Sequence, residues 1–258
     1  MKKQSLVLLL GLSLILLAFK NNKSLTIHLI GDSTVADYAL EENYQQNRFP
    51  LVGWGQMLGP FFKKNSTWQS SKLFKGVENI DVKNYAKGGR STRTFFQEGR
   101  WRQVFNALKP NDLVLIQFGH NDGSIEKTER YVDEQGYKEF LRLYVSQTRL
   151  KKAIPILLTP VARNYPWKNE KLENVHGNYP DAVQEIAREM DVPLIDLNQL
   201  SQDLFTKKGR QHVSENYFMN LPANTYDAYP EGQKDNTHFQ IEGGEAVAQL
   251  VFDALNSL

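Results

Sequence analysis

Two patterns of apolar residues alternate along this chain. Short runs with strand character occupy residues 25–30, 77–85, 112–118, 154–158 and 192–197. The run 112–118 is almost continuously apolar, which is typical of a parallel strand covered on both faces. Apolar residues at helical spacing occupy residues 53–58, 91–108, 137–150, 181–190, 200–208 and 242–255. Alternating strands and helices predict an α/β fold with a parallel sheet, in a single domain.

Turn and capping residues set the expected boundaries of these elements. Pro60 is expected to end the first helix, and Ser91 is expected to cap the second, which Lys109-Pro110-Asn111 closes. The stretches 43–50 and 209–234 lack a clear periodicity, so both are predicted to be loops. No internal repeat interrupts the alternation.

The first twenty residues differ from the rest of the chain. Lys2 and Lys3 precede an apolar block over residues 6–19, and polar residues follow. This pattern is typical of a secretory signal, so residues 1–22 are predicted to be a signal peptide and 23–258 the mature domain. The alternative is a retained membrane anchor, although the block is shorter than the ~20 residues of a usual spanning helix. We therefore expect a secreted or periplasmic protein without membrane attachment after signal removal.

Composition narrows the possible functions. The 258 residues are 41% hydrophobic and 23% charged, as in an ordinary soluble globular protein. The absence of cysteine excludes disulfides, thiolate metal sites and a cysteine nucleophile together. The formal net charge of +2 includes three lysines of the predicted signal, so the mature chain is nearly neutral and no nucleic-acid partner is expected.

Polar residues follow three of the predicted strands. Ser33, Gly89 and Asn121 lie just beyond the first, second and third strands. Carboxyl ends of parallel strands share one sheet edge, so these residues are expected to converge there. Asp235 and His238 are three residues apart in a predicted loop before the last helix, a spacing that permits a hydrogen bond between them.

These residue types are those that serine-dependent acyl transfer requires. Ser33 is the candidate nucleophile, His238 the candidate base and Asp235 the group that orients the imidazole. The backbone N–H groups of Ser33 and Gly89 and the amide of Asn121 are candidate oxyanion donors. Each also has a purely structural interpretation: Ser33 as a helix N-cap, Asn121 as a turn residue, Asp235 as a cap of the last helix.

The turn at Gly31-Asp32-Ser33-Thr34 combines a strand end with helix-capping residue types. A helix is therefore predicted to begin there, and its N-terminal N–H groups would favour an oxyanion.

The other histidines are assigned structural roles. His28 lies inside the first strand and is expected in the core, His120 is expected to support Asn121, and His176 and His212 are expected to be exposed. No H-x-x-x-H or H-x-H spacing occurs, so a zinc or iron site is not expected. The missing G-x-S-x-G elbow argues against the lipase-type α/β-hydrolase fold.

Four short blocks resemble the motifs of the SGNH, or GDSL, hydrolases. In chain order they are Gly31-Asp32-Ser33, Gly88-Gly89-Arg90-Ser91, Gly119-His120-Asn121-Asp122 and Asp235-Asn236-Thr237-His238. The resemblance implies a flavodoxin-like three-layer sandwich with a five-stranded parallel sheet. It also implies Ser33, Asp235 and His238 as catalytic residues, an oxyanion hole of Ser33, Gly89 and Asn121, and no metal or cofactor.

Within this superfamily the chain resembles the rhamnogalacturonan acetylesterase family through Gly53-Trp54-Gly55 and Phe118-Gly119-His120-Asn121-Asp122-Gly123. The long segment before Asp235 resembles the bacterial members of that family more than the fungal ones. This resemblance implies a secreted esterase that removes acetyl groups from rhamnogalacturonan I through an acetyl-enzyme, with an acetylated polysaccharide or oligosaccharide as its partner. Alternatives are an SGNH esterase acting on another glycan such as xylan, a lipid or thioester hydrolase, an acyltransferase, and a glycan-binding protein without activity. The oligomeric state is left open.

Basic and aromatic residues provide weaker indications of substrate. A basic cluster near Gly89 is expected to form a rim for a uronate polymer, or alternatively a solvated helix face: Lys87, Arg90, Arg93, Arg100 and Arg102. Four aromatic residues are candidates for stacking on sugar rings, and the first two are equally compatible with the core: Trp54, Trp101, Tyr165 and Trp167.

Overall fold

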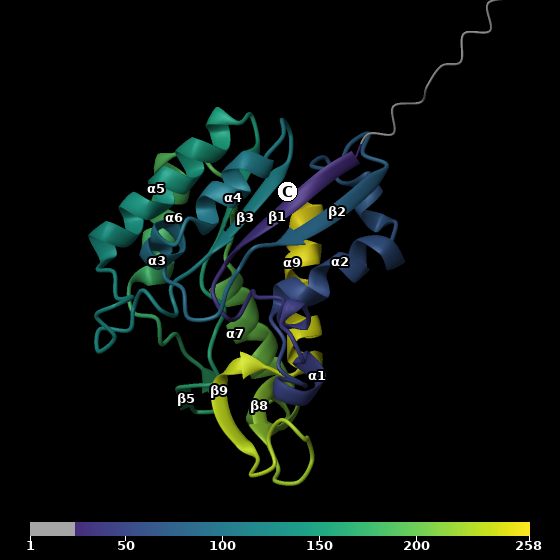
Figure 1. Cartoon of the computed structure of the whole chain (residues 1–258), viewed down its shortest axis with the longest axis vertical. Coiled ribbons are helices and arrows are strands. Elements are labelled where there is room, and N and C mark those ends of the chain that lie inside the picture. Colours follow the sequence, from purple (N-terminus) through teal and green to yellow (C-terminus); the bar gives the residue numbers. More distant parts are fainter. Residues whose placement is uncertain (1–23) are drawn as a thin grey trace, which may run out of the picture.

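Five parallel strands form the central sheet of the computed structural model, which describes residues 24–258 (Figure 1). They are β1 (Ser24–Gly31), β2 (Asn79–Asn84), β3 (Leu113–Gln117), β4 (Ile154–Leu158) and β7 (Leu194–Ile195). Their order is β2-β1-β3-β4-β7, the flavodoxin-like order, and this confirms the predicted fold class. The predicted signal peptide, residues 1–22, lies outside the described residues.

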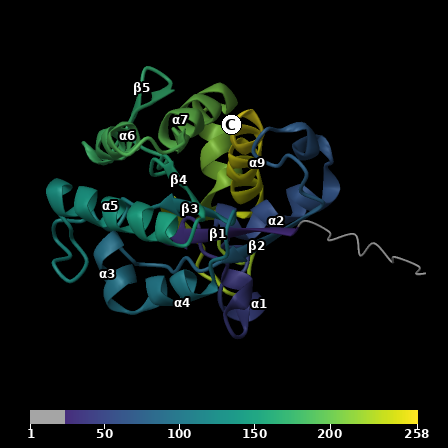
Figure 2. The same ribbon diagram turned by 90° about the horizontal axis from the view of Figure 1, so that it is seen from above.

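Helices cover both faces of the sheet (Figure 2). One face packs against α2 (Trp54–Lys64), α7 (Leu197–Lys208) and α9 (Ile241–Ser257). The other packs against α3 (Thr92–Gln97), α4 (Arg100–Ala107), α5 (Glu134–Leu150) and α6 (Tyr179–Glu189). Consecutive residues of β3 alternate between the two cores: Leu113 and Leu115 belong to the first, Val114 and Ile116 to the second. This two-sided burial explains why the strand is apolar throughout.

Smaller elements complete the described part of the chain. They are η1 (Tyr38–Leu40), α1 (Tyr44–Asn47), η2 (Thr67–Ser70), β5 (Trp167–Lys168), β6 (Lys171–Leu172), α8 (Arg210–His212), the π-helix η3 (Val213–Tyr217), β8 (Phe218–Leu221) and β9 (Gln233–Phe239). Strands β8 and β9 form an antiparallel pair near the carboxyl edge of the main sheet (Figure 1). Within residues 24–258, no helix has the length and apolar content that a membrane crossing requires.

Two predicted helix boundaries are wrong. Helix α2 continues through Pro60 to Lys64, because Phe61 and Phe62 pack against Phe252 of α9 and this contact holds the final turn in place. The helix predicted over residues 91–108 is divided into α3 and α4 at Gly99, whose φ of 72° lies in the left-handed region and interrupts the helix.

The predicted loops 43–50 and 209–234 also contain regular structure. The first includes the single turn α1, and the second includes η3 and β8. Asp235 and His238 lie on β9 rather than in a loop. Strand β9 is mostly polar and belongs to a two-stranded sheet with β8, so it lacks the apolar run that marks a strand of a covered sheet.

Two of the four candidate stacking aromatics belong to the core. Trp54 and Trp101 are 0% and 2% exposed. Trp54 Nε1 donates a hydrogen bond of 2.8 Å to Gln117 Oε1, and Trp101 Nε1 donates to Gln147 Oε1. Their indole rings therefore have no surface to offer a sugar.

Gly53 and Gly59 form a matched pair for testing how α2 packs against the turn that follows β1. A Cβ at Gly53 lies 2.4 Å from the Ala36 carbonyl oxygen, whereas the nearest atom of another element to a Cβ at Gly59, on Val82, is 3.8 Å away. We expect Gly53→Ala to destabilise the protein by about 1–3 kcal/mol through overpacking. Gly59→Ala is expected to change the stability by less than ~1 kcal/mol, because the gain in helix propensity is offset by the contact of its Cβ with the Pro60 ring. Urea unfolding measures both, and equal effects of the two substitutions would contradict this packing.

Candidate active site

The turn after β1 is organised by the Asp32 carboxylate. Its Oδ1 accepts hydrogen bonds from the Thr34 N–H at 2.9 Å and from Thr34 Oγ1 at 2.8 Å. The carboxylate is completely buried, and Ser33 between these two residues is 7% exposed. Asp32 therefore closes a tight turn that holds Ser33 at the carboxyl edge of the sheet.

The helix predicted to begin at this turn does not form. Only one turn is present, in which the Val35 and Ala36 N–H groups donate to the Asp32 carbonyl. The carbonyls of residues 33–35 accept hydrogen bonds from more distant groups instead: Tyr38 Oη, Trp54 N and Asn84 Nδ2. Because a continuing helix needs these carbonyls for its own N–H groups, tertiary hydrogen bonds end it after one turn.

On β9, the Asp235 carboxylate holds the His238 imidazole. His238 Nδ1 lies 2.7 Å from Asp235 Oδ2, and Asp235 Oδ1 accepts the Thr237 and His238 N–H groups. Burial raises the pKa of the Asp235 carboxyl, but its hydrogen bonds to His238 and the backbone lower it more, so the net pKa is below the ordinary value. An ionised carboxylate only accepts, so Nδ1 carries the proton and Nε2 is left as the acceptor.

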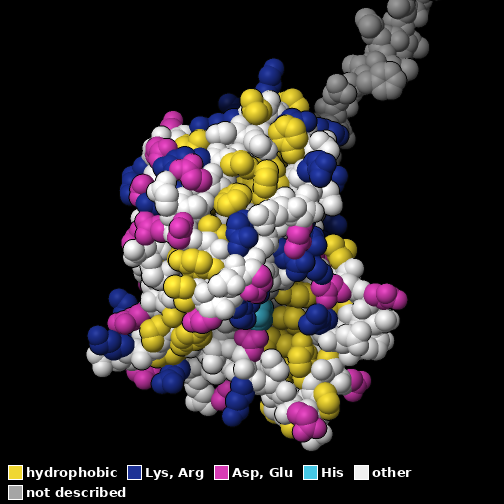
Figure 3. Space-filling view, turned by 60° about the vertical axis from the view of Figure 1, so that its left-hand side comes forward, with side chains coloured by type: hydrophobic (Ala, Val, Ile, Leu, Met, Phe, Trp, Pro, Cys, Tyr) yellow, Lys and Arg dark blue, Asp and Glu magenta, His cyan; other side chains and the backbone are white. Residues whose placement is uncertain are grey.

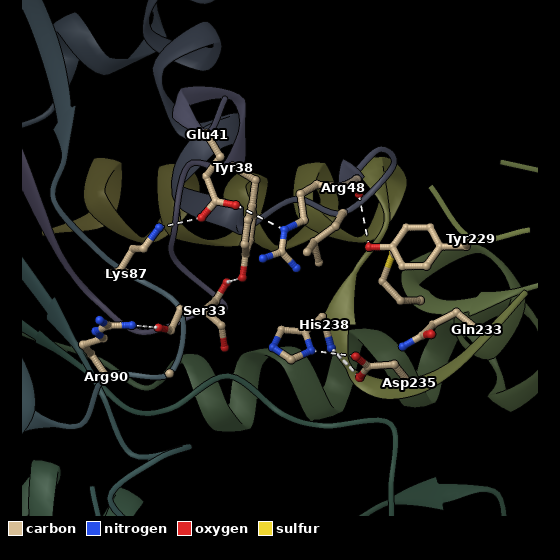
Figure 4. A pocket seen from close by; sticks show the side chains of 14 residues that line it. Ser33, Tyr38, Glu41, Arg48, Lys87, Arg90, Tyr229, Gln233, Asp235 and His238 are labelled. Atoms are coloured by element: carbon tan, nitrogen blue, oxygen red, sulfur yellow. Dashed lines mark hydrogen bonds and ion pairs between the residues drawn. The ribbon is translucent and has the colours of Figure 1, made fainter. Parts of the chain in front are cut away.

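Ser33 and the Asp235–His238 pair line one cavity of about 400 Å³. Figure 4 shows the Ser33 side chain and the imidazole facing each other, with Asp235 behind the ring. No hydrogen bond joins the Ser33 and His238 side chains in the described structure. On the molecular surface, Figure 3 shows a histidine side chain in a hollow that basic, acidic and hydrophobic side chains surround. The predicted convergence of the sheet edge and the last segment is therefore present.

Gly89 lines the same cavity, on the loop that follows β2. Its φ of 79° lies in the left-handed region, where a side chain is strained. A Cβ at the preceding Gly88 lies 3.7 Å from Ser33 Cβ, so this loop passes directly beside the serine. Because neither glycine carries a side chain, the backbone next to Ser33 is accessible.

Asn121 is buried and is not among the residues that line this cavity. Its Nδ2 donates a hydrogen bond of 2.9 Å to the carbonyl of Arg90, the residue after Gly89. Asn121 therefore joins the turn after β3 to the glycine loop. Four predicted site residues share the cavity, and Asn121 is connected to them through this backbone contact.

Asp122 also connects these two loops, and the sequence analysis assigned it no role. It accepts hydrogen bonds from Thr92 N at 2.9 Å, Thr92 Oγ1 at 2.6 Å and Gly119 N at 3.2 Å. Complete burial raises the pKa of the Asp122 carboxyl to about 7, although the Thr92 hydrogen bonds oppose the rise. The sequence feature that could have pointed to Asp122 is its position in the block Gly119-His120-Asn121-Asp122.

The other histidines lie mostly where packing requires them. His28 is in the core as predicted, with Nε2 3.2 Å from Asp112 Oδ2. His120 is buried with Nδ1 3.3 Å from Asp32 Oδ2, so its side chain meets the Ser33 turn rather than Asn121. Burial lowers the pKa of His120, while Asp32 opposes that change.

The prediction that His176 is exposed is wrong. It is 8% exposed, and its Nε2 lies 3.0 Å from the Val161 carbonyl. Its ring packs edge-on against His120 at 4.5 Å between centroids. The burial of His176 comes from these contacts with residues distant in the chain, which local sequence does not reveal. His212 is partly exposed beside Glu242. Among residues 24–258, no cluster of three or more histidine and acidic side chains has the arrangement of a metal site.

The predicted basic rim is only partly present. Lys87 and Arg90 line the cavity, whereas Arg93, Arg100 and Arg102 do not. Other cavity-lining residues were not predicted. Arg48, Tyr229 and Gln233 belong to stretches predicted as loops, and Glu41 lies just before the first of these stretches. The hydrogen bond from Lys87, more than the opposing effect of burial, holds the pKa of Glu41 below its ordinary value.

Comparisons with known proteins agree with this arrangement. The family model described as GDSL-like Lipase/Acylhydrolase matches residues 27–251. The rhamnogalacturonan acetylesterase RhgT of Bacillus subtilis is 36% identical over 236 residues, which are 92% of this chain and 91% of that protein. The probable rhamnogalacturonan acetylesterase YesY of the same organism is 36% identical over 233 residues, 90% of this chain and 93% of that protein.

A solved structure also resembles this fold. The crystal structure of the Bacillus subtilis protein YxiM superposes with a TM-score of 0.72 at 28% identity. The match covers 91% of this chain and 57% of that longer protein.

The buried Asp122 carboxyl predicts a pH-dependent stability difference. Its pKa rises from 3.8 to about 7 on folding, so the folded state keeps a proton that the unfolded state releases in this window. The wild-type protein therefore loses stability as the pH rises from about 4 to about 7. Asparagine cannot ionise, so we expect the stability of Asp122→Asn relative to wild type to increase by roughly 1–3 kcal/mol from pH 5 to pH 8.

Urea unfolding at the two pH values measures this change. The asparagine amide opposes the Gly119 N–H and adds a cost, but that cost does not depend on pH. Asp227→Asn, at an exposed position, is the matched control and is expected to show no such pH dependence. An Asp122→Asn difference that is the same at both pH values would contradict the prediction.

Proposed function

Because this chain belongs to the GDSL-like lipase/acylhydrolase family and is a carboxylic ester hydrolase, we propose that it removes O-acetyl groups from rhamnogalacturonan I, a pectic polysaccharide. Support for the substrate is the similarity, over most of both chains, to two Bacillus relatives whose names give this activity. The observation that carries the chemistry is the Asp235–His238 pair on the same cavity as Ser33.

In the proposed first step, Ser33 Oγ attacks the acetyl carbonyl and His238 Nε2 removes its proton. Asp235 holds Nδ1–H at 2.7 Å, which keeps Nε2 unprotonated before the step and stabilises the imidazolium afterwards. Because the Ser33 and His238 side chains are not hydrogen-bonded in this structure, the proposed step requires them to move together when the ester binds.

The developing oxyanion is stabilised by N–H donors. We assign this role to the backbone N–H groups of Ser33 and Gly89 and to the Asn121 side-chain amide. One Nδ2 hydrogen of Asn121 is used by the Arg90 carbonyl, and the second remains for the substrate. The Arg90 contact thus orients the amide as well as the loop that carries Gly89.

The acetyl-enzyme is then resolved by water. The acetyl-enzyme forms when His238 gives its proton to the departing sugar oxygen. Water then attacks the acetyl carbon while His238 removes its proton, and His238 returns that proton to Ser33 Oγ as acetate leaves. Each of these steps uses side chains and backbone N–H groups of this protein, together with water.

We also propose that the protein is secreted or periplasmic. The support is Lys2 and Lys3 before the apolar block of residues 6–19. The N-terminal residue of the protein recovered from culture medium or periplasm decides between cleavage after residue 22 and a retained segment.

The assigned roles predict specific losses of activity. We expect Ser33→Ala to reduce kcat on 4-nitrophenyl acetate by about 10⁴-fold or more and to abolish fluorophosphonate labelling. Asn121→Ala is expected to reduce kcat by about 10²–10³-fold. Asn106→Ala, an exposed change on α4, is the control and should keep full activity. Wild-type turnover by Ser33→Ala would end this mechanism.

The substrate assignment predicts a preference between two polymers. We expect acetate release from acetylated rhamnogalacturonan to exceed release from acetylated xylan by about tenfold or more in kcat/KM. Enzymatic quantification of acetate from both polymers, at matched acetyl content, measures the ratio. A preference for xylan would replace the proposed substrate but leave the serine mechanism in place.

A further inference from the structure

Two basic side chains on the cavity wall share one acidic partner. Arg48 Nε lies 3.2 Å from Glu41 Oε2, and Lys87 Nζ lies 2.6 Å from Glu41 Oε1. All three residues line the cavity that contains Ser33 and His238. Two cations with one carboxylate leave an excess positive charge on this wall, which favours an anionic group of the ligand.

The terminal nitrogens of Arg48 are available for that group. Among residues 24–258, only Nε of this guanidinium hydrogen-bonds a protein atom, and neither terminal nitrogen does. Figure 4 shows the guanidinium on the side of Glu41, with its terminal nitrogens directed into the cavity toward Ser33 and His238. Arg90, by contrast, uses Nε on Glu98 and Nη1 on the Gly88 carbonyl.

Tertiary contacts hold the Arg48 backbone, and Glu41 orients its half-exposed side chain. Its carbonyl accepts hydrogen bonds from Leu51 N at 2.8 Å and from Tyr229 Oη at 3.3 Å. Glu41 holds the Nε end of the side chain at the same time. The planar guanidinium matches a carboxylate through two parallel hydrogen bonds, and the Glu41 contact orients it for that purpose.

The surroundings of Arg48 favour a sugar carboxylate over a small inorganic anion. Leu51, Met219 and Tyr229 line the same cavity as Arg48 and contribute apolar groups to it. A sugar ring has an apolar C–H face that packs on such surface, whereas a free inorganic anion has none. The cavity that contains Ser33 therefore combines the Arg48 guanidinium with apolar surface on which a sugar ring can pack.

We propose that Arg48 is the subsite for the carboxylate of a uronic acid residue, which it holds in the cavity while the acetyl ester of the same or a neighbouring sugar reaches Ser33. This inference rests on the proposed function and deepens it. Galacturonate carries such a carboxylate and xylose does not, so Arg48 is the residue that separates acidic from neutral glycans.

Inhibition by an unacetylated ligand tests this subsite independently of acetate release. The inhibitor is digalacturonate, and its methyl ester is the uncharged comparator, with 4-nitrophenyl acetate as the reporter substrate. Each inhibition constant compares rates with and without inhibitor for one variant, so changes in the basal rate cancel. We expect the acid to inhibit wild type about tenfold more strongly than its methyl ester.

Three variants separate the carboxylate contact from other effects. Arg48→Gln is expected to remove the preference for the acid, and Arg48→Lys, which keeps the charge but loses the fork, is expected to retain part of it. Arg188→Gln removes one exposed positive charge on α6 and should keep the wild-type preference. Thermal unfolding of each variant verifies that it is folded.

The outcomes distinguish this inference from the proposed function. An unchanged preference in folded Arg48→Gln or Arg48→Lys, or no preference in wild type, overturns the subsite even if the enzyme deacetylates rhamnogalacturonan. A preference that depends on Arg48 supports the subsite even if acetylated rhamnogalacturonan is a poor substrate, in which case the proposed polymer is wrong and another uronate glycan replaces it.

Discussion

The site depends on a buried chain of hydrogen bonds that joins the ends of β1 and β3. Trp54 Nε1 donates to Gln117 Oε1, and Gln117 Nε2 donates to Thr34 Oγ1 at 2.8 Å. Thr34 in turn donates to the Asp32 carboxylate that closes the Ser33 turn. Since each of these polar groups is shielded from water, breaking one link leaves its neighbours without a partner. The turn is thereby held in one conformation at the sheet edge.

The second half of the site approaches from a different direction. The β8–β9 pair carries Asp235 and His238 to the cavity, and it is anchored by packing rather than by the main sheet. Phe218 and Phe239 pair across the two strands and contact Phe205 of α7. Val52 forms a β-bridge with Phe239, so the segment before α2 also holds β9. The serine and the histidine thus belong to separately anchored supports, and the cavity lies between them.

The charge of the cavity follows from this arrangement. Glu41 and Arg48 come from the connection between β1 and α2, and Lys87 comes from the loop after β2. One carboxylate orients both cations, which leaves the terminal nitrogens of Arg48 directed at the space beside Ser33. If Arg48 binds the substrate carboxylate as proposed, substrate selection depends on the polar, irregular segment between β1 and α2.

The sequence alone determined the sheet and much of the chemistry. The strands 113–117 and 154–158, buried except at Ile154, carry strong apolar runs, and the four polar blocks predicted Ser33, Gly89, Asn121 and the Asp235–His238 pair as site residues by residue type and position. Tertiary structure decided what local pattern could not. The turn at Ser33 does not continue as a helix because distant donors occupy its carbonyls, and the polar strand β9 exists because β8 pairs with it. His176 is buried and Arg48 reaches the cavity for the same reason: both belong to polar connections whose course is set by contacts with segments far away in the chain.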